Sequence, residues 1–123
     1  MLDPLWDVFY TDVDYRGCAC GYIRSMGLDL RPDDNSKTLD YYIERINRAD
    51  DIMEVRSRFG THSMIISKNG IEKIYEHFTT KPLWTAVDID IHYIQGIRQY
   101  SSRRDIVSNL RESSSDTLPR CAQ

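Results

Sequence analysis

The sequence contains little cysteine, with three residues in a chain of 123. An odd number cannot all pair in disulfides, and Cys18 and Cys20 lie too close together for a usual zinc knuckle, which would also need a second pair. We therefore expect reduced thiols, as in a cytosolic protein. The chain also lacks an apolar run near the roughly 20 residues that cross a bilayer, and it opens with no basic-then-apolar signal segment. These absences predict a cytoplasmic protein, peripheral to the inner membrane at most.

The chain carries no strong excess of charge of either sign. Its 16 Lys and Arg residues and 19 Asp and Glu residues leave a formal net charge of -3. That balance is too mild to indicate a nucleic-acid-binding surface or an acidic tail. Basic residues gather locally at Arg98, Arg103 and Arg104, where we expect a solvated face rather than a phosphate clamp. The length suits one small domain, or a part of a larger one, with a core that needs neither metal nor disulfide.

Short β-prone runs recur along the chain and predict strands. In residues 52–56 (IMEVR), Met53 and Val55 alternate with Glu54 and Arg56, as in a strand with one buried face. The other predicted strands are residues 6–10 (WDVFY), a more buried strand within 62–67 (HSMIIS), and short pieces at 97–100 and 106–107.

Two segments show the apolar period of an amphipathic helix. The residues at positions i, i+3, i+4 and i+7 are Leu39, Tyr42, Ile43 and Ile46 in the first segment and Ile71, Ile74, Tyr75 and Phe78 in the second. Ser67 or Asn69 is suited to cap the second helix, because a short polar side chain accepts the first free backbone N–H groups. That helix should end near Thr80, before Pro82.

The stretches between and after these elements have the composition of loops. Residues 12–37 contain three glycines and a proline with scattered aromatics, which predicts a long irregular loop, and such loops are usually functional. The residues from 111 onward have almost no apolar content. The sequence thus predicts an α/β domain with a short mixed sheet and two main helices over residues 1–110, followed by a disordered tail at 111–123.

The segment AVDIDIHYI, residues 86–94, concentrates ionisable side chains. As a strand it would place Asp88, Asp90 and His92 on one face, where they could hold Mn²⁺ or Mg²⁺ or supply a general base. As a helix it would keep only Asp88 and His92 as neighbours, four residues apart. The alternative without chemistry is that Asp88 caps a helix and the other two are surface residues. The pattern alone leaves these possibilities open.

A small polar triplet, Gly60, Thr61 and His62, stands directly before an apolar run. Glycine lets a backbone approach a ligand closely, and the next two residues would then present a hydroxyl and an imidazole. A hydrogen-bonded structural histidine is the competing interpretation. The acidic DVD stretch at residues 12–14 invites a metal interpretation, but it sits in a predicted turn, where aspartate is common for backbone reasons.

Three pieces of the chain, in this order, resemble glycosyltransferase family 25, which contains lipopolysaccharide and procollagen galactosyltransferases. WDVFY resembles the family's "WD" strand. FGTHSMIISKNGIEKIYEHF, residues 59–78, is similar to its "GTHAY-ISxxGAxKL" block, the most specific of the three. PLWTAVDIDIHYI, residues 82–94, is similar to its "PxD" segment, with the aspartate at Asp88 or Asp90. A further piece, RQYSSRRDIVSNLRESSSDT, residues 98–117, is similar to the family's closing stretch, in which an aromatic-basic segment precedes a serine-rich end. The resemblance therefore spans about residues 6–117, nearly the whole chain.

The resemblance implies a GT-A type nucleotide-sugar fold and an inverting sugar transfer that uses a nucleotide-sugar donor and a divalent metal. It implies Asp88 or Asp90 as the catalytic carboxylate, and Gly60, Thr61, His62 and Trp84 as substrate contacts, with Tyr93 as a further sugar platform. In the family, the nucleotide-binding half with the acidic metal motif precedes the "WD" strand. This chain therefore resembles the C-terminal half, and the Mn²⁺ or Mg²⁺ would be bound mainly by an N-terminal half. The alternative is a noncatalytic remnant or interaction module that associates through the exposed truncated face.

Overall fold

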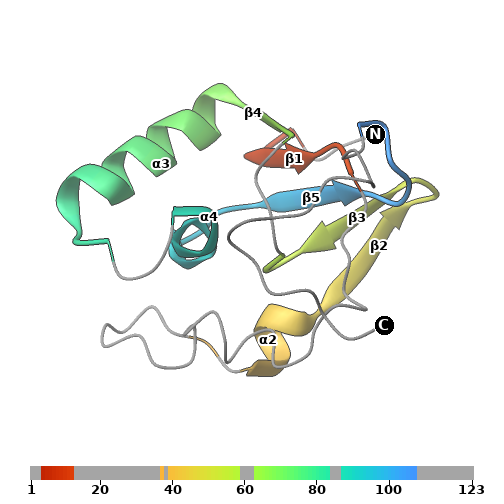
Figure 1. Cartoon of the computed structure of the whole chain (residues 1–123), viewed down its shortest axis with the longest axis horizontal. Coiled ribbons are helices and arrows are strands. Elements are labelled where there is room, and N and C mark those ends of the chain that lie inside the picture. Colours follow the sequence, from red (N-terminus) through yellow and green to blue (C-terminus); the bar gives the residue numbers. More distant parts are fainter. Residues whose placement is uncertain (1–3, 13–36, 38, 59–62, 84–86, 108–123) are drawn as a thin grey trace, which may run out of the picture.

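The computed structural model describes residues 4–12, 37, 39–58, 63–83 and 87–107 (Figure 1). The predicted loop beyond Asp12 and the predicted tail lie outside the described residues. The described elements, in chain order, are β1 (Val8–Tyr10), α2 (Leu39–Ile43), β2 (Arg45–Ala49), β3 (Ile52–Val55), β4 (Met64–Ile66), α3 (Lys68–Thr80), α4 (Val87–Asp90), the 3-10 helix η3 (Ile91–Tyr93) and β5 (Gln99–Ser102).

The strands form one five-stranded mixed sheet. Its order is β2-β3-β5-β1-β4, which Figure 1 shows from the lower right to the top. β1 and β5 run parallel, and the other neighbours pair antiparallel. The chain therefore contains a small α/β domain, and the predicted class and mixed sheet are confirmed. Of the described helices, only α3 is long, with 13 residues, where two main helices were expected.

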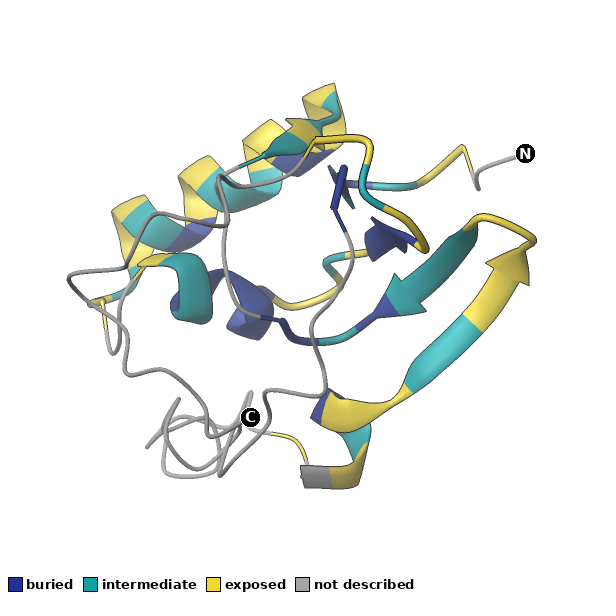
Figure 2. Cartoon of the chain, turned by 45° about the vertical axis from the view of Figure 1, so that its right-hand side comes forward, coloured by how far each residue is buried: buried dark blue, intermediate teal, exposed yellow. Residues whose placement is uncertain are grey.

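The hydrophobic core lies between one face of the sheet and α3. Val8, Tyr10 and Val55 are almost fully buried and form its centre, while Ile74 of α3 and Ile97 pack against them. Val8 and Tyr10 share a face because they are two residues apart in β1. Burying a side chain of this size stabilises the fold by roughly 1.5–3 kcal/mol. Figure 2 shows α3 with its buried residues turned to the sheet and its exposed residues turned outward.

α3 begins and ends where the sequence predicts. Ser67 caps it by accepting a hydrogen bond from the Gly70 backbone N–H, and the helix ends at Thr80. Its buried face is different from the predicted one, because Ile71 and Tyr75 are 56% and 71% exposed. The helix touches the sheet through Gly70, where an added Cβ would lie 2.4 Å from the Asp7 carbonyl oxygen. That close approach rotates the helix, so part of its apolar stripe faces outward.

Replacing Gly70 with alanine is expected to destabilise the domain by about 1–3 kcal/mol, because the new methyl group meets backbone atoms of β1 that cannot rotate away. Ile71→Ala, one residue further along α3, removes an exposed side chain and is expected to change stability by no more than about 0.5 kcal/mol. Urea unfolding of both variants measures the difference. Equal stability of Gly70→Ala and wild type would contradict the packing of α3 described above.

The first predicted helix is wrong in length. α2 ends at Ile43, and Ile46 belongs to strand β2, which pairs with β3. The guanidinium of Arg45 donates hydrogen bonds to the carbonyl oxygens of Tyr42 and Ser57, which fixes the chain at this change of direction. Strand pairing thus overrides the helical apolar period here, since tertiary contacts outweigh local propensity.

Three other expectations are corrected. The strand within 62–67 is β4, an edge strand whose Ile65 is 54% exposed, rather than a more buried strand. Residues 87–93 are helical, so the interpretation of AVDIDIHYI as a strand is wrong. Residues 90–94 are all buried. In a segment buried on all sides, the alternation of apolar and polar residues does not indicate which face is exposed, so it does not predict a strand. Residues 106–107 form a bend rather than a strand, whereas the predicted strand near 97–100 exists as β5.

Basic residues near the end of the described chain lie on the surface, as expected. Arg103 hydrogen-bonds the side-chain oxygen of Asn47, and Arg104 forms an exposed ion pair with Asp51 at 3.1 Å. Exposed pairs of this kind contribute little to stability. Within the described ranges, no helix combines the length and the apolar surface that a bilayer span requires.

Candidate functional site

The six residues predicted to bind substrate or react fall into two groups. Those outside the described residues are Gly60, Thr61, His62 and Trp84. The other two, Asp88 and Asp90, lie on the single turn of α4 and differ in exposure: the first is half-buried and the second is fully buried. Asp88 is thus the acid of this pair that solvent reaches.

Asp90 faces the helix α3. Its Oδ2 atom lies 3.8 Å from Nε2 of His77, which is itself 6% exposed. This separation exceeds a hydrogen bond, and the two side chains meet as neighbours in the layer between α3 and α4. Asp90 and His77 therefore lie at the contact between two consecutive helices, α3 and α4.

His92, in η3, joins the AVDIDIHYI segment to the residues just before the Gly-Thr-His block. Its Nδ1 atom lies 3.1 Å from Oε1 of Gln99, which also accepts a hydrogen bond from the Tyr10 hydroxyl at 2.7 Å. Its Nε2 atom lies 3.2 Å from the backbone N and 2.9 Å from the backbone O of Arg58. Because Oε1 can only accept, Nδ1 carries a ring proton; Nε2 accepts from the Arg58 N–H when unprotonated and donates to the Arg58 carbonyl when protonated.

The surroundings of His92 favour the neutral imidazole. Burial lowers its pKa from 6.5 to about 4, because the charged ring would lose its hydration. The hydrogen bonds to Arg58 and Gln99 and the charge of Asp88 act in the opposite direction, and the charge of Arg58 lowers the pKa further. His92 is thus uncharged near neutral pH. Its ring is a structural hydrogen-bonding group rather than a surface residue.

Arg58 is the most completely engaged charged side chain of the described core. It is 1% exposed, and its Nη2 atom donates to both carboxylate oxygens of Asp12 at 2.9 Å. Its Nη1 atom donates to the Asp12 carbonyl at 3.1 Å and to Oγ of Ser101 at 3.0 Å. The guanidinium also lies over the ring of Tyr10, 4.3 Å from its centroid. Nη2 thus contacts both carboxylate oxygens while Nη1 holds the Asp12 carbonyl, and these charge-assisted bonds fix Arg58 beside the end of β1.

Sequence reasoning missed this cluster. Asp12 was considered only as part of the DVD stretch, for a metal or a turn role, and nothing local distinguishes Arg58 from Arg56, which is half-buried and lies over the ring of Tyr41. A charged side chain is expected at the surface unless it is paired, and the pairing partner lies 46 positions away. The signal that could have indicated this pair was the position of Asp12, an acidic residue shortly after the predicted strand at residues 6–10.

A second buried acid lies at the other end of β1. Asp7 is fully buried, and its Oδ2 atom accepts hydrogen bonds from Nζ of Lys73 at 2.7 Å and from the backbone N of Arg98 at 2.8 Å. Its carbonyl accepts from the backbone N of Ser67 at 2.9 Å, and Oγ of Ser67 donates to the carbonyl of Trp6 at 2.8 Å. These contacts attach the start of α3 to the start of β1.

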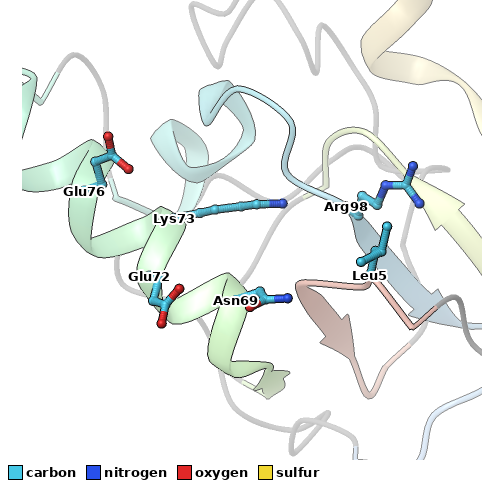
Figure 3. Close-up of a pocket in the computed structure, with 6 residues that line it drawn as sticks. All are labelled: Leu5, Asn69, Glu72, Lys73, Glu76 and Arg98. Atoms are coloured by element: carbon cyan, nitrogen blue, oxygen red, sulfur yellow. The ribbon is translucent and has the colours of Figure 1, made fainter.

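An open cavity of about 400 Å³ lies over this second cluster (Figure 3). Lys73 reaches across from α3 toward Arg98 at its centre. The lining residues are Leu5, Asn69, Glu72, Lys73, Glu76 and Arg98. Neither Asp88 nor Asp90 lines this cavity, and its charges of both signs indicate no single ligand class.

The described residues supply few of the other predicted parts. Tyr93 is 2% exposed, and its ring packs edge-on against Tyr42 with the centroids 5.9 Å apart, so it belongs to the core rather than to an open sugar platform. In the described part of the chain, no group of three or more His, Cys, Asp or Glu side chains is arranged to hold a metal ion.

The fold and these clusters define a small α/β domain whose charged residues gather at both ends of β1. Comparison with known proteins found no matching family model, no similar curated protein and no similar solved structure.

Proposed function

We propose that this chain is the C-terminal portion of an inverting glycosyltransferase. It would transfer a sugar, galactose or similar, from a nucleotide-sugar donor to a glycan or lipopolysaccharide-type acceptor within a GT-A type fold. The observation that carries the proposal is the contact of Arg58 with His92, because it joins the residue preceding the FGTH block to the segment that carries Asp88. The two segments that resemble the family's "GTH" block and "PxD" segment are thus connected by a direct contact.

Contacts between the matched pieces also support the resemblance. In the "ISxxGAxKL" pattern, the serine, glycine and lysine fall at Ser67, Gly70 and Lys73. Each of them touches the "WD" pair: Ser67 bonds Trp6 and Asp7, Gly70 approaches the Asp7 carbonyl, and Lys73 pairs with the Asp7 carboxylate. The serine, glycine and lysine of the pattern therefore each make a contact that attaches α3 to the start of β1.

In the proposed reaction, a carboxylate takes the proton of the acceptor hydroxyl as its oxygen attacks the anomeric carbon and the bond to the diphosphate breaks. We assign this role to Asp88, because Asp90 is fully buried beside His77. Thr61 and His62 would hydrogen-bond the sugar or the acceptor. A bound Mn²⁺ or Mg²⁺ would neutralise charge on the leaving diphosphate, with ligands mainly from an N-terminal half.

Asp88→Asn, in a transferase that contains this chain with its nucleotide-binding half, is expected to lower kcat by about 10²–10⁴-fold with the donor KM unchanged, since only proton transfer is removed. His62→Ala should abolish transfer while the fold survives. Radiolabelled sugar transfer and circular dichroism measure both. Asp40→Asn, an exposed acid on α2, is the matched control and should leave kcat unchanged.

Calorimetric titration of the chain with UDP and Mn²⁺ tests the donor side. UDP binding would support a donor site to which this chain contributes. In the activity assay above, full activity of Asp88→Asn would overturn the assignment of Asp88 as the base. Absence of UDP binding by the folded chain would support a half-site that lacks its nucleotide-binding half. The second candidate function is a noncatalytic interaction module. The exposed apolar side chains of Ile65, Ile71 and Tyr75, on edge strand β4 and the outer side of α3, are the observation in its favour.

A further inference from the structure

The five-stranded sheet has two edges, and they differ in how well they are protected. β2 forms one edge and β4 forms the other (Figure 1). β2 carries two arginines, Arg45 and Arg48, and its register with β3 shifts between Asn47 and Ala49. Charged side chains and irregular registers are features by which natural edge strands avoid pairing with other chains. β4 has neither, because Met64–Ile66 contains only apolar residues and its register with β1 is unbroken.

The hydrogen bonds to β1 show which backbone groups of β4 point outward. Two of these bonds flank the strand pair, from the backbone N of Thr11 to the Ser63 carbonyl and from the backbone N of Ser67 to the Asp7 carbonyl. Bonded and non-bonded pairs alternate along an antiparallel ladder, so the next bonded position of β4 is Ile65. The N–H and C=O groups of Met64 and Ile66 therefore point away from β1. No other described strand lies on that side.

This alternation determines how a second copy of β4 can pair with the first. Met64 and Ile66 lie symmetrically about Ile65, so a two-fold axis at Ile65 brings Met64 of one copy opposite Ile66 of the other. Both residues present an N–H and a C=O group at this edge, so the opposed residues can exchange backbone hydrogen bonds. Ile65 then lies opposite its own equivalent in a non-bonded pair, where side chains approach most closely.

The side chains of the two edge strands favour β4 over β2 for contact with a second copy. Ile65 is 54% exposed, on the opposite face of the sheet from Val8 and Tyr10, so contact with its equivalent covers apolar surface that water reaches in the single chain. A two-fold axis places like residues near one another. β4 has no charge to repel its copy, whereas the same contact at β2 brings arginines of the two copies together.

We propose that β4 pairs antiparallel with β4 of a second copy of this chain, so that the two sheets join into one continuous sheet around an isologous contact. Because the two-fold axis is perpendicular to the sheet, both copies of α3 lie on the same face of the joined sheet. The contact consists of a few main-chain bonds and one pair of isoleucines, so the association is weak and depends on protein concentration. The proposal rests on the sheet alone and does not depend on the proposed transferase function.

Sedimentation equilibrium of the whole chain, between about 10 µM and about 1 mM, tests the proposal. The wild type should form dimers at the upper concentrations. Ile65→Lys and Ile65→Glu should each raise the dissociation constant at least about tenfold, because like charges then face each other across the axis. Circular dichroism checks that both variants fold. Ile43→Lys changes an isoleucine on α2 that is 41% exposed; it is the matched control and should dimerise like the wild type.

Mixing the two charged variants locates the axis. Ile65→Lys and Ile65→Glu should associate with each other at least about tenfold more tightly than either does with itself, because residue 65 of one copy lies opposite residue 65 of the other. Failure of the folded mixture to associate, while the wild type dimerises, places the contact elsewhere and overturns the proposal. A wild-type chain that stays monomeric throughout, or an Ile65→Lys variant that dimerises like the wild type, also overturns it.

Hydrogen exchange of the wild type identifies the edge itself and needs no variant. The outward amides of Met64 and Ile66 should exchange at least about tenfold more slowly in concentrated than in dilute protein, whereas the amide of Ile65, which faces β1, should not change. Slow exchange at Met64 and Ile66 in a chain that stays monomeric would mean that another segment occupies the edge, which overturns the proposal. Rates independent of concentration in a chain that dimerises would do the same.

Discussion

Replacing Arg58 with methionine is expected to lower the free energy of unfolding by about 3–5 kcal/mol, because it leaves the Asp12 carboxylate buried without its guanidinium. The variant also loses the hydrogen bond to Ser101 and the contact with the Tyr10 ring. A small domain has only about 5–15 kcal/mol of total stability, so this loss is a large share of the total. Urea unfolding monitored by circular dichroism measures the loss.

Two further variants show whether the buried pair is the cause. Arg104→Met breaks the exposed pair with Asp51 and is expected to cost no more than about 1 kcal/mol. The double variant Arg58→Met with Asp12→Leu should be more stable than Arg58→Met alone, because no charge is then left buried. A cost for Arg58→Met as small as that of Arg104→Met would contradict the buried arrangement.

Lowering the pH from 7.5 to 5 is expected to destabilise the domain through His92 by about 2 kcal/mol, which follows from a pKa of about 4 in the folded chain and 6.5 in the unfolded chain. The unfolded chain binds a proton on this ring below pH 6.5, whereas the folded chain keeps it neutral until about pH 4. The stabilising effect is therefore complete above pH 6.5 and is lost as the pH falls toward 4.

His92→Gln is the variant that isolates this effect. A glutamine does not titrate, so the difference in unfolding free energy between wild type and variant should shrink by about 2 kcal/mol between pH 7.5 and pH 5. The other histidines and the carboxylates are common to both chains and cancel in this difference. A difference that stays constant with pH would show that the ring of His92 is hydrated and not buried against Arg58 and Gln99.

These two results bear on function as well as on stability. The ring of His92 contacts the backbone N and O of Arg58, so it joins the residue that precedes the FGTH block to the segment carrying Asp88. Loss of the His92 ring removes this contact directly, whereas loss of the Arg58 side chain removes the pair with Asp12 that holds residue 58 in place. Under the proposed function, loss of either side chain is therefore expected to reduce transfer although neither contacts the reacting atoms, since small misplacements of reacting groups are costly.

The elements that the sequence predicted well have strong local signals. α3 has a capping serine, Ser67, and an apolar period over 13 residues, while β3 and the core of β1 alternate or cluster β-prone residues. Capping and periodicity act within one turn or one strand, so the sequence alone determines them. The same holds for the α/β class.

What the sequence by itself determined, therefore, is where α3, β1 and β3 lie and which segments carry ionisable groups. Only the tertiary structure decided that Ile46 belongs to a strand, that Asp90 is buried beside His77, and that Arg58 pairs with Asp12. The physical reason is distance along the chain. Ile46 pairs with Glu54 of the next strand, Asp90 lies beside His77 of the preceding helix, and Asp12 is 46 positions from Arg58, so each partner lies outside the residue's own element. The close approach of α3 to β1, which sets the buried face of the helix, exists only once the sheet has formed.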